Sequence, residues 1–117
     1  MTLRPARAEA AYKTNTAAIA AVVLFSAIQA RAETIRIEAK SLAFSPAQVT
    51  AHIGDTIEWG NADFVAHTAT AKNHDWDVQL PANGSKRVVL KKVGTVEYFC
   101  RFHPNMTGTV TIEEKKH

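Results

Sequence analysis

Short apolar runs with a period of two constrain the fold of this chain more than any other feature. Beyond residue 33 few segments have the spacing of an amphipathic helix, and alternating runs separated by turn residues dominate. Ile35, Ile37 and Ala39, for example, share one face of the first run. The predicted strands are residues 34–39, 48–53, 56–60, 67–71, 76–80, 85–91, 95–100 and 109–113. This pattern predicts an all-β fold, an antiparallel sandwich or barrel of about seven to eight strands.

The first third of the chain does not fit this pattern. A basic segment is followed by a 12-residue apolar run at 17–28 and by the triplet Ala30-Arg31-Ala32. This order is typical of a secretory signal peptide, so we predict that residues 1–32 are removed after Ala32 and that residues 33–117 form one exported domain. An uncleaved membrane anchor is the alternative, but the run is shorter than the ~20 residues that span a bilayer.

The basic character of the chain belongs to this leader. Four of the 14 Lys and Arg residues and one of the 11 Asp and Glu residues lie in 1–32, which leaves ten of each sign in 33–117. A near-neutral domain gives no reason to expect a nucleic-acid partner. The pairs Lys86-Arg87 and Lys91-Lys92 are interpreted as solvated strand ends, with a docking patch for an acidic partner as the alternative.

A single cysteine stands in the predicted exported domain. Small exported domains usually gain stability from disulfides, but Cys100 has no second cysteine in the chain to pair with. Intermolecular pairing, an inert buried thiol and a metal thiolate are the three possibilities. Alternation in residues 95–100 places Cys100 on the same face as Val96 and Tyr98, pointing inward at the end of a strand.

The neighbours of this cysteine favour the metal thiolate. Cys100, His103 and Met106 form a Cys-x2-His-x2-Met motif, and His67 begins a different predicted strand. Two imidazoles, one thiolate and one thioether are the ligands of a blue-copper electron-transfer site, with methionine as the weak axial ligand. Each residue alone has a plainer explanation, as a polar strand residue, a buried thiol or core filling. Zinc also binds Cys and His, but methionine adds little for that metal.

The motifs give the chain a resemblance to a known family. The stretches Trp59-Gly60-Asn61 to His67-Thr68, Tyr98-Phe99-Cys100 to Met106, and Gly108-Thr109-Val110 resemble the cupredoxin family, and the spacing of the last two ligands is similar to that of the amicyanins and plastocyanins within it. The resemblance implies a Greek-key β-sandwich with one type 1 copper. It also implies a monomer that shuttles single electrons between periplasmic redox proteins, for example a dehydrogenase and a c-type cytochrome.

Roles for individual residues follow from the resemblance. His67 would be the upstream imidazole ligand, Cys100 the thiolate, His103 the exposed ligand through which electrons leave, and Met106 the axial ligand. Phe64, Phe102 and Pro104 are candidates for the apolar patch that docks partners in this family, although Phe64 also fits a core position. Two residues depart from the family: Thr68 replaces the usual asparagine, and Arg101 replaces the usual threonine. Arg101 would favour an acidic partner or raise the reduction potential.

Two functions share this ligand set. We expect a soluble electron carrier, and a periplasmic protein that delivers or buffers copper is the alternative. A metal-free binding module would leave Cys100, His103 and Met106 without a role. An enzyme is not expected, because four protein ligands leave copper no open position and the chain has no nucleotide-binding or nucleophile motif.

Overall fold

The computed structural model describes residues 31–115, so the predicted leader lies almost entirely outside it. Nine strands and no helix form in this range. The strands are β1 (Thr34–Lys40), β2 (Ala43–Ser45), β3 (Gln48–His52), β4 (Thr56–Asn61), β5 (His67–Ala71), β6 (Asp77–Leu80), β7 (Ser85–Val89), β8 (Gly94–Phe99) and β9 (Thr107–Glu113). In the described part of the chain there is accordingly no helix long and apolar enough to cross a membrane.

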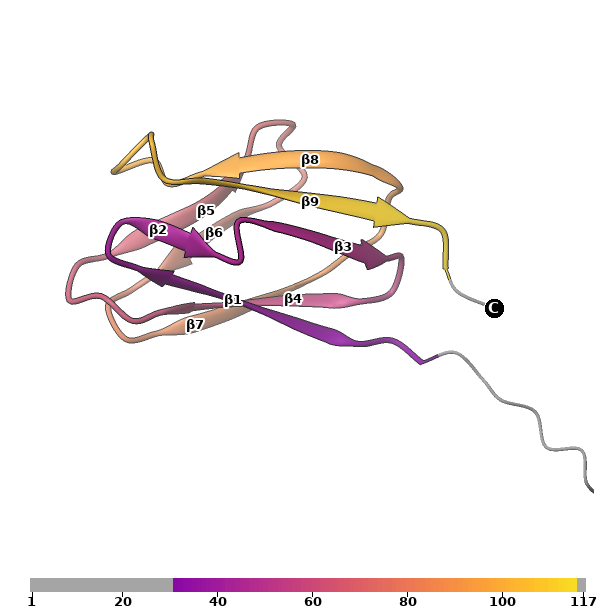
Figure 1. Ribbon diagram of the computed structural model, residues 1–117, viewed down its shortest axis with the longest axis horizontal. Helices are drawn as coiled ribbons and strands as arrows, with labels where there is room; N and C mark the ends of the chain where they lie inside the picture. The colour runs from indigo at the N-terminus through magenta and orange to yellow at the C-terminus, as the bar shows by residue number, and fades with distance from the viewer. Residues whose placement is uncertain (1–30, 116–117) are drawn as a thin grey trace, which may run out of the picture.

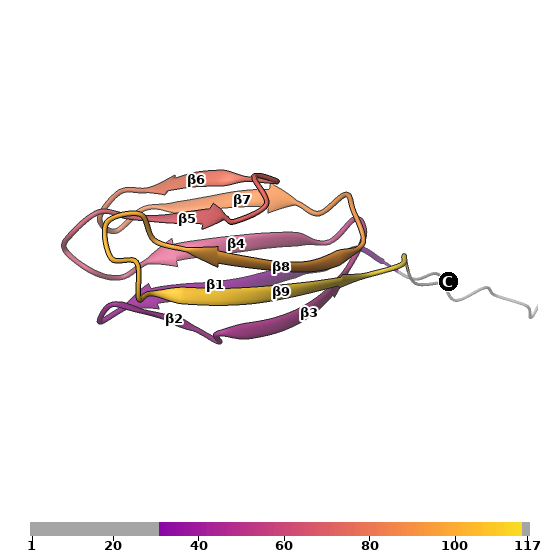
Figure 2. The same cartoon turned by 90° about the horizontal axis from the view of Figure 1, so that it is seen from above.

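The strands form two sheets that face each other (Figures 1 and 2). One has the order β2-β1-β4-β7 and the other the order β3-β9-β8-β5-β6. The predicted all-β Greek-key sandwich is confirmed, and all eight predicted strands are present. The ninth, β2, is only three residues long and buries one side chain, Phe44, so it offers too little alternation to be recognised.

The sheets are mixed rather than wholly antiparallel. β1 pairs with β4, and β3 pairs with β9, in parallel. The first pairing has a simple cause. Between β1 and β4 the chain crosses into the other sheet as β3, and it therefore re-enters the first sheet from the same end.

Alternating side chains fill the space between the sheets, as the period of two predicts. Three strands each bury two alternate side chains: Ile37 and Ala39 of β1, Ile57 and Trp59 of β4, and Val96 and Tyr98 of β8. Burial of one large aliphatic side chain contributes roughly 1.5–3 kcal/mol. Trp59 and Tyr98 meet edge to face with ring centroids 5.4 Å apart, and burial raises the pKa of Tyr98 to about 12. The core is therefore apolar and anchored by aromatic rings.

A glycine makes room for one of these rings. Gly108 on β9 lies directly opposite Tyr98 on β8. A Cβ atom at Gly108 would stand 2.3 Å from the Tyr98 ring, far inside any van der Waals contact. Only glycine lets the tyrosine ring cross the neighbouring strand here, two residues before Cys100.

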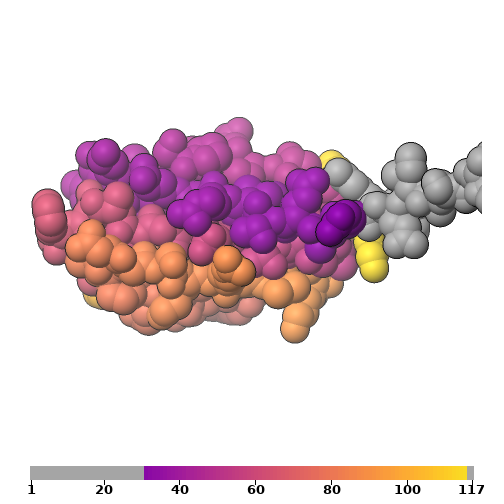
Figure 3. All heavy atoms as spheres, turned by 90° about the horizontal axis from the view of Figure 1, so that it is seen from below, coloured from indigo at the N-terminus to yellow at the C-terminus, as the bar shows by residue number. Residues whose placement is uncertain are grey.

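The fold gathers several connections at one end of the sandwich. The β1–β2 turn, the β4–β5 loop and the β8–β9 loop all lie at the left end of Figure 1, and Figure 2 shows the same arrangement from above. β9 runs from this end to the opposite one. Figure 3 shows the outer face of the four-stranded sheet, from the indigo residues of β1 to the orange residues of β7.

Candidate metal centre

His67 reaches the site from the first position of β5. Asn61, the last residue of β4, fixes the loop that precedes it: the Asn61 Nδ2 group donates to the carbonyls of Val65 and Leu80, each at 2.9 Å. The Asn61 Oδ1 atom accepts the backbone N–H of Asp63 at 2.8 Å. The buried amide of Asn61 thus joins the start of the β4–β5 loop to its end and to Leu80 on β6. As a result the His67 side chain is completely buried at the end of the sandwich.

Cys100, His103 and Met106 lie in the hairpin loop between β8 and β9. The His103 N–H donates to the Cys100 carbonyl at 3.2 Å, and the Met106 N–H donates to the His103 carbonyl at 2.8 Å. The Cys100 N–H closes the loop by donating to the Met106 carbonyl at 3.0 Å. Cys100 and Met106 are buried, whereas His103 is half-buried. The three spaced residues therefore share one compact, internally bonded loop.

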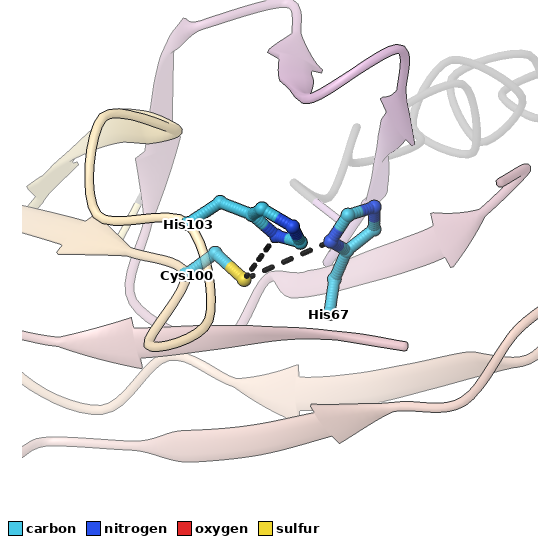
Figure 4. Close-up of side chains that lie close together, drawn as sticks. All are labelled: His67, Cys100 and His103. Atoms are coloured by element: carbon cyan, nitrogen blue, oxygen red, sulfur yellow. Dashed lines mark hydrogen bonds between the residues drawn. The ribbon is translucent and has the colours of Figure 1, made fainter. Parts of the chain in front are cut away.

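The sulfur and two ring nitrogens converge, as Figure 4 shows. The Cys100 Sγ atom lies 3.7 Å from Nδ1 of His67 and 3.8 Å from Nδ1 of His103. One candidate ligand atom from each residue lies within 4.8 Å of the other two. Bond lengths of the kind zinc makes to sulfur and nitrogen, about 2.3 and 2.0 Å, would hold two such atoms roughly 3.5–3.7 Å apart. The three side chains therefore fit around a single metal ion.

The family to which this chain belongs is shown by comparison with known proteins. A family model described as a cupredoxin-like domain matches residues 14–112. The chain is a cupredoxin. It is 30% identical over 104 residues to amicyanin-alpha of Methylorubrum extorquens, with 84% of this chain and 87% of that protein covered. The resemblance inferred from the motifs is confirmed.

Solved structures agree at the level of the fold. A reduced amicyanin mutant superimposes with a TM-score of 0.60 at 21% identity, covering 68% of this chain and 82% of its own. A purple cupredoxin from Nitrosopumilus maritimus superimposes with a TM-score of 0.61 at 23% identity, covering 68% of this chain and 99% of its own. The sandwich described above is thus a cupredoxin sandwich.

The burial of Cys100 separates the three interpretations of its thiol. The sulfur cannot pair with another molecule, because the residue has no exposed surface. An inert thiol would not need two imidazole nitrogens at its side. The Thr68 N–H also donates to Sγ, at 3.3 Å. These contacts suit a thiolate that binds a cation in this cupredoxin.

Met106, the predicted fourth ligand, lies in the same loop as Cys100 and His103. Its side chain is buried, and its carbonyl accepts the hydrogen bond from Cys100 that closes the loop. Binding of the metal by its thioether sulfur stays a prediction from the sequence motif and the family.

Thr68 stands where many cupredoxins have asparagine, and its hydroxyl ties the two ligand segments together. The Thr68 Oγ1 atom accepts the Arg101 N–H at 2.8 Å. The link joins β5, next to His67, to the residue after Cys100. Threonine at position 68 therefore still provides a hydrogen bond between the segment that carries His67 and the loop that carries Cys100.

Arg101, the second departure, is paired on the protein surface. Its guanidinium group lies 3.4 Å from Asp77 Oδ1 on β6, and both side chains are about half exposed. Thr70 Oγ1 also donates to Asp77 Oδ1, at 2.8 Å. The positive charge beside Cys100 thus has a negative neighbour in this cupredoxin. Asp77 could not be identified from the sequence, because this contact depends on how β5 and β6 pair.

Asp63, which the sequence pattern did not single out, contacts the predicted ligand His67. Its Oδ2 atom lies 2.8 Å from Nε2 of His67, on the side of the ring away from Cys100. The backbone amide of Ser41, followed by the hydrogen bond with His67, holds the pKa of the Asp63 carboxyl below its ordinary value. A carboxylate four residues before a ligand histidine is the available signal, and it is too common to stand out.

Apolar side chains are exposed at the same end of the cupredoxin. Phe64 is 92% exposed, which rules out the core position considered for it, and Phe102 is 55% exposed. Leu42 in the β1–β2 turn and Val65 are also about half exposed. We call these four residues the apolar end. By contrast His74, exposed in the turn before β6, is not part of the ligand group.

Proposed function

We propose that this cupredoxin is a type 1 copper protein that carries one electron at a time between redox partners in the periplasm. The observation that carries the proposal is the buried Cys100 sulfur with the Nδ1 atoms of His67 and His103 at 3.7 and 3.8 Å. The donor set of one thiolate and two imidazoles, with a methionine in the same loop, suits copper in both of its oxidation states. When bound, copper supplies a one-electron couple between Cu(I) and Cu(II).

The protein's own contribution is a site that keeps its shape. His67 is fixed by β5 and by Asn61, Cys100 by the end of β8, and the loop between Cys100 and Met106 by three backbone hydrogen bonds. Ligands held this way move little when the charge of the ion changes, and little reorganisation makes transfer fast. His103 is the one partly exposed member of the group of His67, Cys100 and His103, so we assign it the path by which electrons leave.

The surroundings support protein partners of the redox type. The apolar end exposes four large side chains: Leu42, Phe64, Val65 and Phe102. Exposed apolar patches of this kind mark interaction sites. A redox donor and an acceptor, for example a dehydrogenase and a c-type cytochrome, are the partners we expect for a monomer released into the periplasm by removal of residues 1–32. We assign it no enzymatic activity.

Addition of Cu(II) to the purified protein tests the proposal. We expect an intense visible absorption band from copper–thiolate bonding, a type 1 paramagnetic resonance spectrum and a reversible one-electron couple. Cys100→Ser should abolish all three while the circular dichroism spectrum keeps its β-sheet form, and His74→Ala, which changes a histidine outside the group, should keep them. Colour retained by Cys100→Ser would remove Cys100 from the site and overturn the proposal.

The same samples separate the carrier from the copper-delivery alternative. A carrier keeps its copper through repeated oxidation and reduction. A delivery protein gives up Cu(I) rapidly to a competing chelator and needs no blue colour.

A further inference from the structure

Asp63 contacts the ligand His67 on the ring nitrogen that faces away from the site. Asp63 Oδ2 and His67 Nε2 are 2.8 Å apart, a short distance typical of a hydrogen bond to a charged acceptor. The His67 side chain is fully buried, and that of Asp63 is only 18% exposed. The contact is therefore largely sheltered from competing water.

The Asp63 carboxylate is itself contacted by two backbone amides, and the Asp63 backbone makes a further hydrogen bond. Its Oδ1 atom accepts the Ser41 N–H at 2.9 Å, and the Leu42 N–H makes a longer contact of 3.5 Å with Oδ2. Ser41 and Leu42 have φ angles of 54° and 61°, so two successive left-handed residues direct their amides to one carboxylate. The Asp63 N–H donates to Asn61 at 2.8 Å. The β1–β2 turn and the end of β4 thus fix the group that contacts His67.

The chemistry of a carboxylate decides where the His67 proton lies. A deprotonated carboxylate has only acceptor atoms, so the ring nitrogen that faces it must carry the hydrogen. A neutral imidazole carries one N–H, which leaves Nδ1 of His67 with a free lone pair. That nitrogen is the one 3.7 Å from Cys100 Sγ.

We infer that Asp63 is a positioning residue for the metal site: it holds His67 in the Nε2–H tautomer and in the ring orientation that presents Nδ1 to the ion. The inference rests on the proposed function for the identity of the ion, but the tautomer is a property of the metal-free protein. A capping residue for the β1–β2 turn would need only the amides of Ser41 and Leu42, and the contact with His67 goes beyond that role.

The chain contains a matched carboxylate that lacks contact with a ligand. Asp55 accepts the backbone amides of Glu33 and His52, both at 2.9 Å, and is similarly sheltered. It lies in the β3–β4 turn, far in the fold from the β8–β9 loop (Figure 1). Asp55→Asn therefore removes a carboxylate that accepts two backbone amides, and it changes no contact of His67, Cys100 or His103.

The first measurement needs no variant. Long-range nitrogen–proton correlation spectra of the metal-free wild-type protein identify the tautomer of each histidine. We expect the Nε2–H form for His67, with a slowly exchanging ring proton. A Nδ1–H form, or a rapidly averaging mixture of the two tautomers, would overturn the inference.

The second measurement compares Asp63→Asn with Asp55→Asn in competition with a Cu(I) chelator. An asparagine has one oxygen, so it must present its NH2 group either to Ser41 or to His67 and loses one of the two contacts. Loss of a partner that orients a ligand typically weakens metal binding by ~10–100-fold, which we expect for Asp63→Asn only. Equal affinities for the two variants would contradict the positioning role.

Two controls complete the design. Circular dichroism shows whether each variant is folded. If Asp63→Asn does not fold, the tautomer of His67 in the wild-type protein still tests the positioning role of Asp63. A wild-type protein that shows the Nε2–H tautomer but no type 1 copper spectrum would contradict the proposed function and leave the role of Asp63 standing, with Zn(II) affinity as the readout.

Discussion

Thr68 contacts Cys100 through its N–H group and the next residue, Arg101, through its hydroxyl. Its N–H donates to the sulfur at 3.3 Å, and its hydroxyl accepts the next backbone amide along the loop, that of Arg101, at 2.8 Å. The side chain is completely buried, so water does not replace either bond when it is lost. A residue that differs from the common asparagine of the family therefore still fixes the sulfur and the start of its loop.

Removal of the Thr68 hydroxyl should loosen this loop. Thr68→Val keeps the shape but leaves the Arg101 N–H without its acceptor, at a cost of about 1–3 kcal/mol. We expect the Arg101 amide of the metal-free protein to exchange its hydrogen about tenfold faster or more, since tenfold corresponds to about 1.4 kcal/mol. Thr68→Ser keeps the hydroxyl and should keep the protection. Equal exchange in the two variants would show that the hydroxyl does not hold the loop.

At the scale of elements, the β8–β9 hairpin carries three of the four predicted ligands and depends on one close approach. Tyr98 is completely buried and crosses Gly108, where a Cβ atom would stand 2.3 Å from the ring. Cys100 follows two residues after Tyr98, directly beyond the end of β8. The position of the Cys100 sulfur therefore depends on how Tyr98 packs against Gly108.

Gly108→Ala should disrupt this hairpin. Overpacking of a core typically costs about 1–3 kcal/mol, and here the methyl group meets a ring that is packed on its other sides. Urea unfolding of the metal-free protein measures the loss in unfolding free energy. Gly60→Ala on β4 is the control, because its Cβ atom would find only the end of the Arg36 side chain at 3.5 Å. Equal stabilities of the two variants would show that Tyr98 moves aside at little cost.

Local patterns in the sequence predicted the parts of the structure that depend on neighbouring residues. The alternation of Ile35, Ile37 and Ala39, and the spacing of Cys100, His103 and Met106, are local, and the strands and the loop follow from them. His67 was predicted from its residue type and from the family resemblance, and the structure brings its Nδ1 atom to the Cys100 sulfur.

Features that depend on distant segments could not be predicted in this way. The parallel pairing of β1 with β4 follows from the path of the chain between the sheets. The contact of Asp63 with His67 and that of Asp77 with Arg101 arise only when loops and strands meet. Phe64 had two possible places, and only the folded loop shows that it is exposed.

At the scale of the whole molecule, most of the large apolar side chains that are exposed in the described residues lie at one end. The apolar end surrounds the metal-ligand group, whereas the basic side chains Arg87 and Lys92 form ion pairs with Glu58 at 3.5 Å and Asp75 at 3.1 Å. These pairs favour the interpretation of the two basic pairs as solvated strand ends. Encounters that bring another redox site near His103 therefore meet apolar surface first.

Electron exchange between two copies of the protein tests the apolar end without any knowledge of the partners. Nuclear magnetic resonance line broadening in mixtures of oxidised and reduced protein gives the rate. Phe64→Ser should slow it about tenfold, because aromatic residues are enriched among the few interface residues whose truncation costs more than 1 kcal/mol of association.

Val93→Ser in the β7–β8 loop, which removes a 53% exposed apolar side chain away from this end, should leave the rate unchanged. A similar slowing in both variants would place the contact elsewhere on the surface.

The β8–β9 loop and the C-terminal end of β9 lie at opposite ends of the sandwich, which has a consequence for attaching the protein to a surface (Figure 1). A tether attached beyond Glu113, the last residue of β9, would leave the sandwich at the end opposite the β8–β9 loop (Figure 1). Molecules fixed to a solid support by such a tether would all turn the same face to the solution, with the imidazole of His103 uncovered.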